Sequence, residues 1–191
     1  MDKKWYALFS HTGAEIKNIV DTTRILPEQI WTDNADYDGA LNLPWYSRAG
    51  LHYGNAQCIN HFLESDVAPN SVVTLNGYMR IIPAKTIKAC HDKDICILNI
   101  HPAPIVQYPE LKGKDPQPRL YQGILDGQYR TIGVVIHEVD EGVDTGNVIC
   151  EYNEYAGNVR SLTDLYQKLH SMGTQMWCTL FEGGLLNGQD S

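Results

Sequence analysis

The sequence has no long apolar stretch and few basic residues. Its longest apolar runs, such as residues 95–98, are far shorter than the roughly 20 residues that a membrane-spanning helix needs. The 191 residues include 15 Lys and Arg against 23 Asp and Glu, so the formal net charge is −8. Because like charges repel, this balance disfavours broad binding to nucleic acid or to an anionic membrane. We therefore expect neither as a partner.

The five cysteines do not form a recognisable framework. They are odd in number, widely spaced and without a C-x-x-C pair, which argues against a disulfide scaffold and against structural zinc. The first ten residues, MDKKWYALFS, lack the apolar core and the cleavage site of a secretion signal. The sequence therefore predicts a reduced, cytoplasmic environment.

Short apolar segments alternate with segments of helical periodicity. Strands are predicted over residues 5–9, 29–32, 71–75, 95–100 and 132–139, and helices over residues 14–21, 54–64, 119–125 and 161–181. This alternation predicts an α/β fold with a mostly parallel, twisted sheet and helices on both faces. Residues 33–50 are rich in turn formers and are predicted to be a long loop, as is the proline-rich segment 107–118.

Asn99 and His101 end one of the predicted strands. Alternate residues of a strand share a face, so the two side chains should project together at its carboxyl end. Ligands of open α/β sheets bind at that edge. An amide and an imidazole can both hydrogen-bond a carbonyl oxygen as negative charge develops on it. The alternative is that the two residues only cap the strand.

An acidic loop follows the predicted strand that ends at Val139. It holds Asp140, Glu141 and Asp144, with glycines at 142 and 146 that should let the chain turn sharply. Such carboxylates can orient a histidine, hold water or bind a cation. The spacing lacks the alternating oxygen ligands of an EF-hand loop, so calcium is disfavoured. A merely solvated loop is the alternative.

Three segments together resemble the 10-formyltetrahydrofolate-dependent formyltransferases, the group that includes glycinamide ribonucleotide formyltransferase. They are LNGYMRIIP at 75–83, NIHPAPIVQYPELKG at 99–113 and GVVIHEVDEGVDTGNVI at 133–149. The resemblance implies a single-domain, Rossmann-like formyltransferase fold over residues 1–183, followed by a flexible tail at 184–191. It also implies catalytic roles for Asn99, His101 and Asp144.

What the resemblance implies chemically is formyl transfer from 10-formyltetrahydrofolate to a primary amine, without a metal. Asn99 would hold the oxyanion, and His101 would stabilise it or take part in proton transfer. Asp144 would favour the charged imidazole and order a water that shuttles the proton. His137 also matches a family histidine, and its role could be either packing or catalysis.

The resemblance implies that residues 78–82 line the pterin pocket of the folate and that the acidic loop at 139–144 closes over it. The implied cofactor-binding residues are Tyr78, Met79, Arg80, Ile81, Ile82, Ile87, Ile97, Val139, Asp140 and Glu141. Flat heteroaromatic rings suit a slot with apolar walls and polar edges. For the apolar members the alternative is core packing, and Arg80 would face either the glutamate tail or solvent.

The acceptor side departs from the family pattern. The implied substrate-binding residues are Ser10, His11, Thr12, Gly13 and Arg48. The polar family loop that binds a ribose phosphate continues here as Ala14 and Glu15, and a carboxylate beside a phosphate is unfavourable. Leu169 stands where the glycinamide ribonucleotide enzyme has a glutamate.

These departures predict either that the acceptor is another small-molecule amine, such as a nucleotide-like metabolite or an amino sugar, or that glycinamide ribonucleotide is held in another way. We do not expect tRNA as the acceptor, because the chain is acidic and the similar methionyl-tRNA enzymes use a further C-terminal domain to bind tRNA. Two alternatives stay open: a hydrolase that releases formate with water as acceptor, and a non-catalytic folate or nucleotide sensor. The protein would be a monomer or a homodimer.

Overall fold

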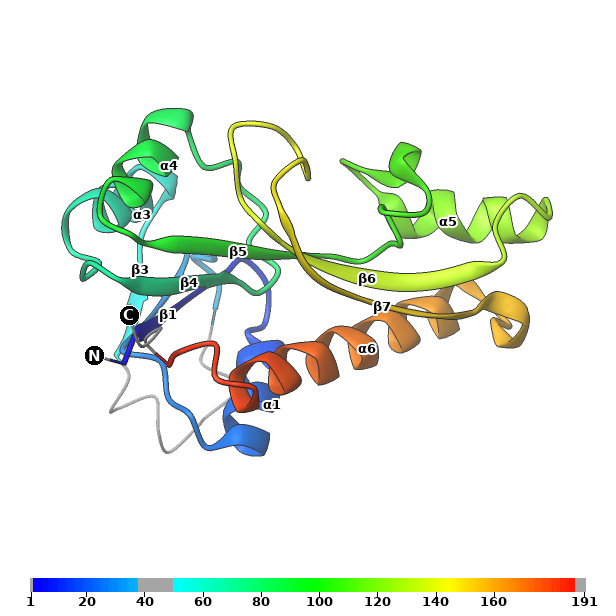
Figure 1. The fold of residues 1–191 in the computed structure, drawn as a ribbon, viewed down its shortest axis with the longest axis horizontal. Helices are drawn as coiled ribbons and strands as arrows, with labels where there is room; N and C mark the ends of the chain where they lie inside the picture. Colours follow the sequence, from blue (N-terminus) through cyan, green and yellow to red (C-terminus); the bar gives the residue numbers. More distant parts are fainter. Residues whose placement is uncertain (1, 38–49, 188–191) are drawn as a thin grey trace. The chain divides into compact units, whose positions relative to one another are not determined.

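The computed structural model describes residues 2–37 and 50–187. The chain divides into two compact units, one of residues 1–99 with 178–191 and one of residues 100–177. Their elements are labelled in Figure 1. Within the described residues, no helix combines the length and apolar character needed to cross a membrane.

The first unit is built on parallel strands hydrogen-bonded in the order β3-β2-β1-β4-β5. They are β1 (Lys4–Phe9), β2 (Gln29–Thr32), β3 (Leu51–Tyr53), β4 (Ser71–Leu75) and β5 (Cys96–His101), of which the last two residues belong to the second unit. All of β4 and nearly all of β1 are buried, as expected for central strands covered on both faces. In the register, Leu8 pairs with Leu75 and Leu75 with Asn99, so the carboxyl ends of three strands meet at one edge.

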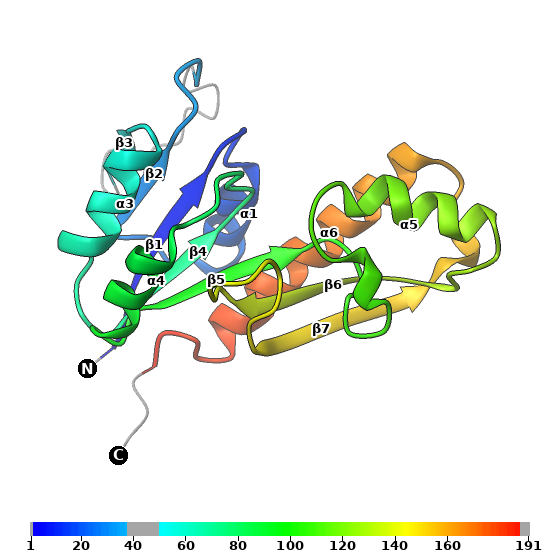
Figure 2. The same ribbon diagram turned by 90° about the horizontal axis from the view of Figure 1, so that it is seen from above.

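Helices cover both faces of this parallel sheet. Helix α1 (Ala14–Thr23) lies on one face, and α3 (Ala56–Ser65) and α4 (Ala84–His91) lie on the other (Figure 1 and, from above, Figure 2). The α3 N-terminus is fixed by Asn55, whose side chain accepts a hydrogen bond from the Cys58 amide. On the α1 side, the buried Trp5 ring packs on Phe181 at a centroid distance of 4.4 Å.

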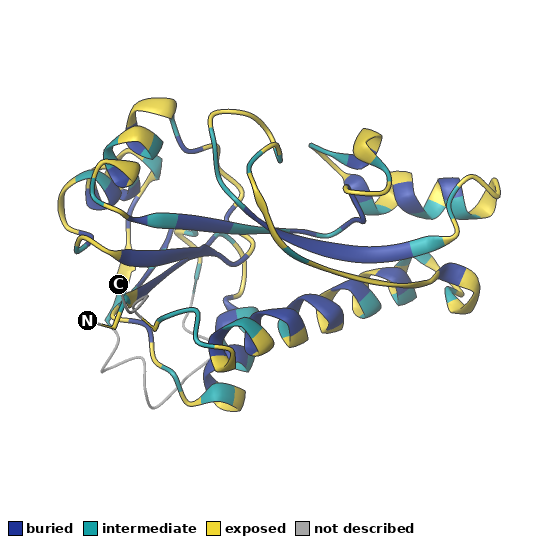
Figure 3. Cartoon of the chain, in the orientation of Figure 1, coloured by how far each residue is buried: buried dark blue, intermediate teal, exposed yellow. Residues whose placement is uncertain are grey.

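The second unit contains an antiparallel pair, β6 (Thr131–Glu138) and β7 (Val148–Tyr155). Strand β6 is almost wholly buried, whereas β7 is exposed along its length (Figure 3). The unit also holds α5 (Pro116–Leu125), the short helices η1 (Pro109–Leu111) and η2 (Ala156–Asn158), and α6 (Leu162–Glu182) as far as Trp177. Buried apolar residues on α6 follow the predicted helical spacing: Leu165, Leu169, Met172 and Met176.

The predicted α/β fold with a mostly parallel sheet is confirmed. All predicted strands and helices are present, with ends that differ by three residues at most. Five elements were not predicted: β3, α4, β7 and the short helices η1 and η2. Strand β7 lacks a buried face and depends on pairing with β6, so its own sequence gives no period-two signal. Of the predicted loop at 33–50, residues 38–49 lie outside the described part of the chain.

Candidate active site

Strand β5 carries two of the predicted catalytic residues, Asn99 and His101. His101 is buried, with 5% of its side chain exposed, and Asn99 is half-buried. Asn99 and His101 are two positions apart, which is the side-chain repeat of a β-strand. Their side chains therefore leave β5 on the same face. They stand at the carboxyl end of the strand, immediately before Pro102.

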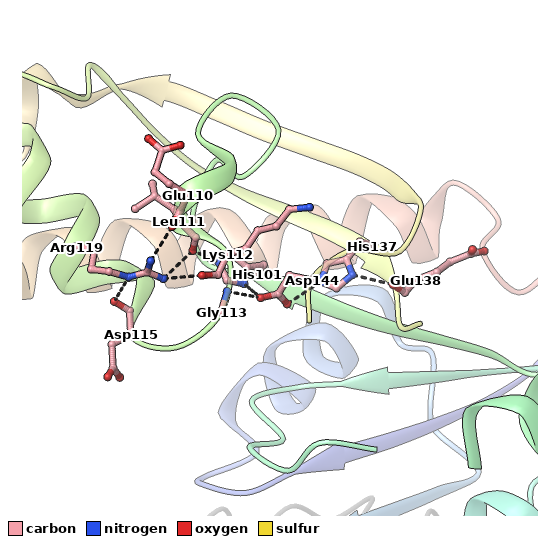
Figure 4. Close-up of polar contacts among 10 residues, drawn as sticks. All are labelled: His101, Glu110, Leu111, Lys112, Gly113, Asp115, Arg119, His137, Glu138 and Asp144. Carbon is pink, nitrogen blue, oxygen red and sulfur yellow. Dashed lines mark hydrogen bonds and ion pairs between the residues drawn. The ribbon is translucent and has the colours of Figure 1, made fainter. Parts of the chain in front are cut away.

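Asp144 lies between two buried histidines (Figure 4). Its Oδ2 is 3.0 Å from Nδ1 of His101, and its Oδ1 is 3.3 Å from Nε2 of His137. The exposed fraction of the side chain is 11% for Asp144, 5% for His101 and 3% for His137. The structure therefore brings together His101, Asp144 and the histidine whose role the sequence left open.

The other nitrogen of each ring also faces an oxygen. Nε2 of His101 donates to the Leu111 carbonyl at 3.0 Å, and Nδ1 of His137 donates to the Glu138 carbonyl at 2.8 Å. A carbonyl can only accept, and so can an ionised carboxylate. Each ring is therefore held at both nitrogens by oxygen acceptors, which fixes the orientation of the two imidazoles.

The charged state of Asp144 is strongly supported by its surroundings. Burial opposes ionisation, but hydrogen bonds from His101 and His137, the charge of His101 and the Gly113 amide outweigh it. The pKa of Asp144 therefore lies far below its ordinary value. The result is an ionised carboxylate held between two imidazoles.

The acidic loop is shaped by hydrogen bonds and by close backbone packing. Oδ1 of Asp140 accepts from the Gly142 amide at 3.0 Å and from the Thr145 hydroxyl at 2.7 Å. The left-handed residue of the turn is Asp144, with φ of 54°, rather than either predicted glycine. Gly146 is required for another reason, since a Cβ there would lie 2.0 Å from the Glu138 carbonyl oxygen.

Sequence reasoning missed a second group of contacts around the histidine. The Gly113 amide donates to Oδ2 of Asp144 at 2.8 Å, and the Arg119 guanidinium donates to the Leu111 carbonyl at 3.1 Å. Leu111 and Gly113 lie in the predicted proline-rich loop, and Arg119 lies at the start of the helix predicted over residues 119–125. Neither contact produces a periodic pattern in the sequence, so neither was predicted.

In the first unit, a cleft of about 340 Å³ opens beside the loops that follow β1, β2 and β4. Its lining residues are Ser10, His11, Asp33, Asn34, Ala35, Asp36, Met79 and Arg80. Nε of Arg80 lies 2.5 Å from Oδ2 of Asp33, whose side chain is 5% exposed. Burial opposes ionisation of Asp33, but hydrogen bonds from Ser10 and Arg80 and the Arg80 charge prevail and lower its pKa. Arg80 thus has a protein partner, which the sequence did not indicate.

The predicted acceptor residues on the loop after β1 mostly support the loop itself. Ser10 Oγ accepts from the Met79 amide at 2.9 Å, and Thr12 Oγ1 accepts from the Ala14 amide at 3.3 Å. Gly13, with φ of 66°, begins α1 in the left-handed conformation that glycine adopts without strain. His11 lines the cleft. Arg48 lies outside the described residues.

Glu15 has a defined partner in the first turn of α1. Its Oε2 accepts a hydrogen bond of 2.8 Å from Asn76 Nδ2. Asn76 Oδ1 in turn accepts from Thr74 at 2.7 Å, and Thr74 accepts from the Trp5 indole at 2.8 Å. This chain of hydrogen bonds fixes a carboxylate at the helix N-terminus, where an anionic ligand would otherwise be favoured.

The predicted folate residues divide by exposure. Tyr78, Ile82 and Ile97 are buried, and Ile87, Val139 and Asp140 are half-buried. Arg80 and Glu141 are exposed, as are Met79 at 67% and Ile81 at 83%.

Two features of the 78–82 segment fit a flat aromatic ligand. Met79 and Ile81 are large apolar side chains exposed to solvent, which a flat ring could cover. Burial raises the pKa of Tyr78 to about 12, and its hydroxyl has no hydrogen-bond partner within residues 2–37 and 50–187. Ile82 and Ile97 match their alternative, core packing.

Comparison with known proteins identifies the family. The family model for formyl transferase matches residues 53–180, about two thirds of the chain. The chain belongs to the formyl transferase family. A Bacillus subtilis phosphoribosylglycinamide formyltransferase is 25% identical over 185 residues, which cover 89% of this chain and 88% of that protein. The trifunctional purine biosynthetic protein adenosine-3 of Drosophila melanogaster is also 25% identical, over 163 residues; they cover 78% of this chain but only 11% of that protein.

Solved structures of the formyl transferase family share the fold. The phosphoribosylglycinamide formyltransferase of Streptococcus pneumoniae superposes with a TM-score of 0.73 at 22% identity, over 95% of this chain and 98% of that one. A formyltetrahydrofolate deformylase from Pseudomonas syringae superposes with a TM-score of 0.68 at 17% identity, over 97% of this chain and 61% of that one. The fold is therefore shared by proteins that are named for different reactions.

Proposed function

We propose that this chain transfers a formyl group from 10-formyltetrahydrofolate to a primary amine of a small molecule. One observation carries the proposal: an ionised Asp144 lies 3.0 Å from His101. His101 itself follows Asn99 by two residues on strand β5. The family membership supplies the reaction class. Residues 1–183 would form the catalytic domain, as a monomer or a homodimer.

When bound, the donor supplies a formyl carbon on a nitrogen that must leave. Asn99 would donate to the formyl oxygen as charge develops on it, and one such preorganised donor is worth about 3 kcal/mol. His101 would act as a fixed cation near that oxygen, because both its nitrogens already face protein oxygens. Proton movement from the amine to the leaving nitrogen would then use water ordered by Asp144 rather than the imidazole.

Each unit offers candidate residues for the donor: the 78–82 segment in the first unit and the acidic loop in the second. Met79 and Ile81 offer exposed apolar surface for the ring system. Val139 and Glu141 would contribute from the loop after β6. Asp140 would act by holding that loop, since its Oδ1 is bonded to Gly142 and Thr145.

The charges near the β1 loop support an acceptor without a phosphate dianion there. Asp33 and Asp36 line the cleft, and Glu15 occupies the start of α1. Arg80 is the cation among the described lining residues, and it is paired with Asp33. Hydroxyl or ammonium groups suit this surface better than a phosphate, because the carboxylates are hydrogen-bond acceptors only. We therefore propose a hydroxylated amine, such as a nucleoside-like metabolite or an amino sugar.

A cytoplasmic location is part of the proposal. All five cysteines are free in the structure. A reducing compartment is where such cysteines persist.

The test is to incubate the purified protein with 10-formyltetrahydrofolate, with and without a pool of amine metabolites. Tetrahydrofolate and formate are measured, and mass spectrometry follows metabolites that acquire a formyl group. Amine-dependent release of tetrahydrofolate supports the transferase. Formate release that needs no amine identifies a hydrolase, which would use the same three residues, and saturable binding without turnover identifies a sensor. His101→Ala serves as the inactive control.

A further inference from the structure

Arg119 donates to four main-chain carbonyls around the turn that precedes α5. The guanidinium donates to Glu110 O at 2.7 Å, Leu111 O at 3.1 Å and Lys112 O at 2.8 Å, and its Nε donates to Asp115 O at 3.4 Å. The residue lies in the first turns of α5 and is exposed as a whole, but its donors point inward to this turn (Figure 4). A single side chain therefore fixes residues 110–112.

The same turn touches both members of the His101 and Asp144 pair. The Leu111 carbonyl accepts from Nε2 of His101 at 3.0 Å, so it is shared by the imidazole and Arg119. Two residues later, the Gly113 amide donates at 2.8 Å to Oδ2 of Asp144, the oxygen that also faces His101. The turn thus closes a ring of contacts through the imidazole, the carboxylate and the backbone.

We propose that Arg119 is a positioning residue for catalysis, which acts through the Leu111 carbonyl to fix the orientation of the His101 ring. This inference rests on the proposed formyl transfer. A ring with two anchored nitrogens has no freedom to rotate, so its charge stays directed at one point. Without Arg119, the turn keeps its backbone hydrogen bonds to Tyr108 and Pro109, but the Leu111 carbonyl loses the donor that fixes its direction toward the imidazole.

The geometry of the guanidinium is essential to this role. Arginine offers five donors in a rigid, planar fork, and here they reach four carbonyls at once. A lysine would bring the same charge as a single point and could not span them. The Arg119→Lys variant therefore separates positioning by the fork from a general effect of positive charge.

The experiment compares Arg119→Ala, Arg119→Lys and the wild type in steady-state formyl transfer and in NMR of 15N-histidine-labelled protein. Misplacement of a catalytic group by about 1 Å lowers rates by as much as about 100-fold, so we expect kcat of Arg119→Ala to fall between tenfold and 100-fold. KM for 10-formyltetrahydrofolate should stay within about threefold, and Arg119→Lys should recover little of the loss. The Nε2 proton of His101, buried and hydrogen-bonded in the wild type, should exchange with solvent at least about tenfold faster in both variants.

Arg160→Ala is the matched control, because Arg160 is exposed and its side chain has no assigned contact with the site. It should leave kcat and the His101 signal unchanged. If Arg119→Ala lowers only the melting temperature, with kcat and the His101 proton as in the wild type, the residue is merely structural and the proposal is wrong. Full recovery by lysine also overturns it.

The NMR readout keeps this inference separate from the proposed reaction. If the wild type shows no turnover with any amine or with water, formyl transfer fails as the function. A changed His101 signal in Arg119→Ala would then still support the positioning link, and an unchanged one would refute it.

Discussion

The carboxylate of Asp144 lies 3.0 Å from Nδ1 of His101, and the second nitrogen of that imidazole faces the carbonyl of Leu111 at the same distance. The histidine is therefore held from both sides by acceptors. This relationship fixes the orientation of the imidazole. It also ties the end of β5 to two loops that are distant in the sequence.

Removal of the proposed catalytic side chains should abolish most turnover and leave the fold intact. We expect Asn99→Ala to lower kcat by about 100-fold, which corresponds to the loss of one preorganised donor. His101→Ala should have at least as large an effect, since it removes the charge near the developing oxyanion. Turnover is measured by tetrahydrofolate release and folding by circular dichroism. His91→Ala, on the exposed end of α4, is the control. Wild-type turnover in folded His101→Ala would contradict the assignment.

The lowered pKa of Asp144 predicts a specific loss of stability in acid. A carboxyl with a depressed pKa in the folded state stabilises the protein above its unfolded value of about 3.9, and this contribution disappears as the pH falls toward the folded value. Asp144→Asn should lower the free energy of unfolding at pH 7 by roughly 3 kcal/mol, because it breaks a buried charge pair.

The difference between Asp144→Asn and the wild type should then shrink below about pH 4. Urea denaturation of both proteins over a pH series measures it. Other carboxyl groups titrate equally in the two proteins, so the comparison isolates Asp144. A difference that stays constant down to acid pH would show that Asp144 is not ionised in a charge pair.

Two glycines of the acidic loop should tolerate alanine differently. A Cβ at Gly146 would lie 2.0 Å from the backbone oxygen of Glu138, so the backbone must move. At Gly142 the nearest atom is the Thr145 hydroxyl oxygen, at 1.9 Å, which belongs to a side chain that can rotate.

We expect Gly146→Ala to lower the free energy of unfolding by about 3 kcal/mol and Gly142→Ala by about 1 kcal/mol, the latter through the lost hydrogen bond to Asp140. Chemical denaturation of each variant checks the order. The reverse order would mean that the loop after β6 differs from the structure described.

The pairing of Asp33 with Arg80 predicts the preference for an unphosphorylated acceptor. Glycinamide ribonucleotide and its dephosphorylated riboside are a pair of probes that differ only in the phosphate. Wild-type protein should have the lower KM for the riboside. Asp33→Asn should lower KM for the phosphorylated probe by about fivefold, because it releases the exposed Arg80 to pair with phosphate.

Asp21→Asn provides the matched control, as it makes the same charge change at an exposed ion pair with Lys17. It should change neither KM. A wild-type preference for the phosphorylated probe, or an equal effect of Asp33→Asn on both probes, would disprove the acceptor class.

The fold was largely accessible from the sequence because its signals are local. Buried runs such as 71–75 and the apolar spacing of α6 predict their elements with bounds close to those observed. Helix α4 was not predicted because it is short and has only two buried residues, Thr86 and Cys90. Strand β7 was not predicted because it is a strand through its pairing with β6, and its own sequence has no strand pattern.

Three features follow from the amino-acid sequence alone: the α/β architecture, the placement of Asn99 and His101 on the same face of one strand, and the acidic loop that carries Asp144. Only the tertiary structure decided which groups meet: His137 on the second oxygen of Asp144, Asp33 with Arg80, and Arg119 on the turn that holds His101. The physical reason is one of range. Periodicity and turn chemistry act over a few neighbouring residues, whereas a hydrogen bond between distant segments exists only after the chain has folded and set their distance and direction.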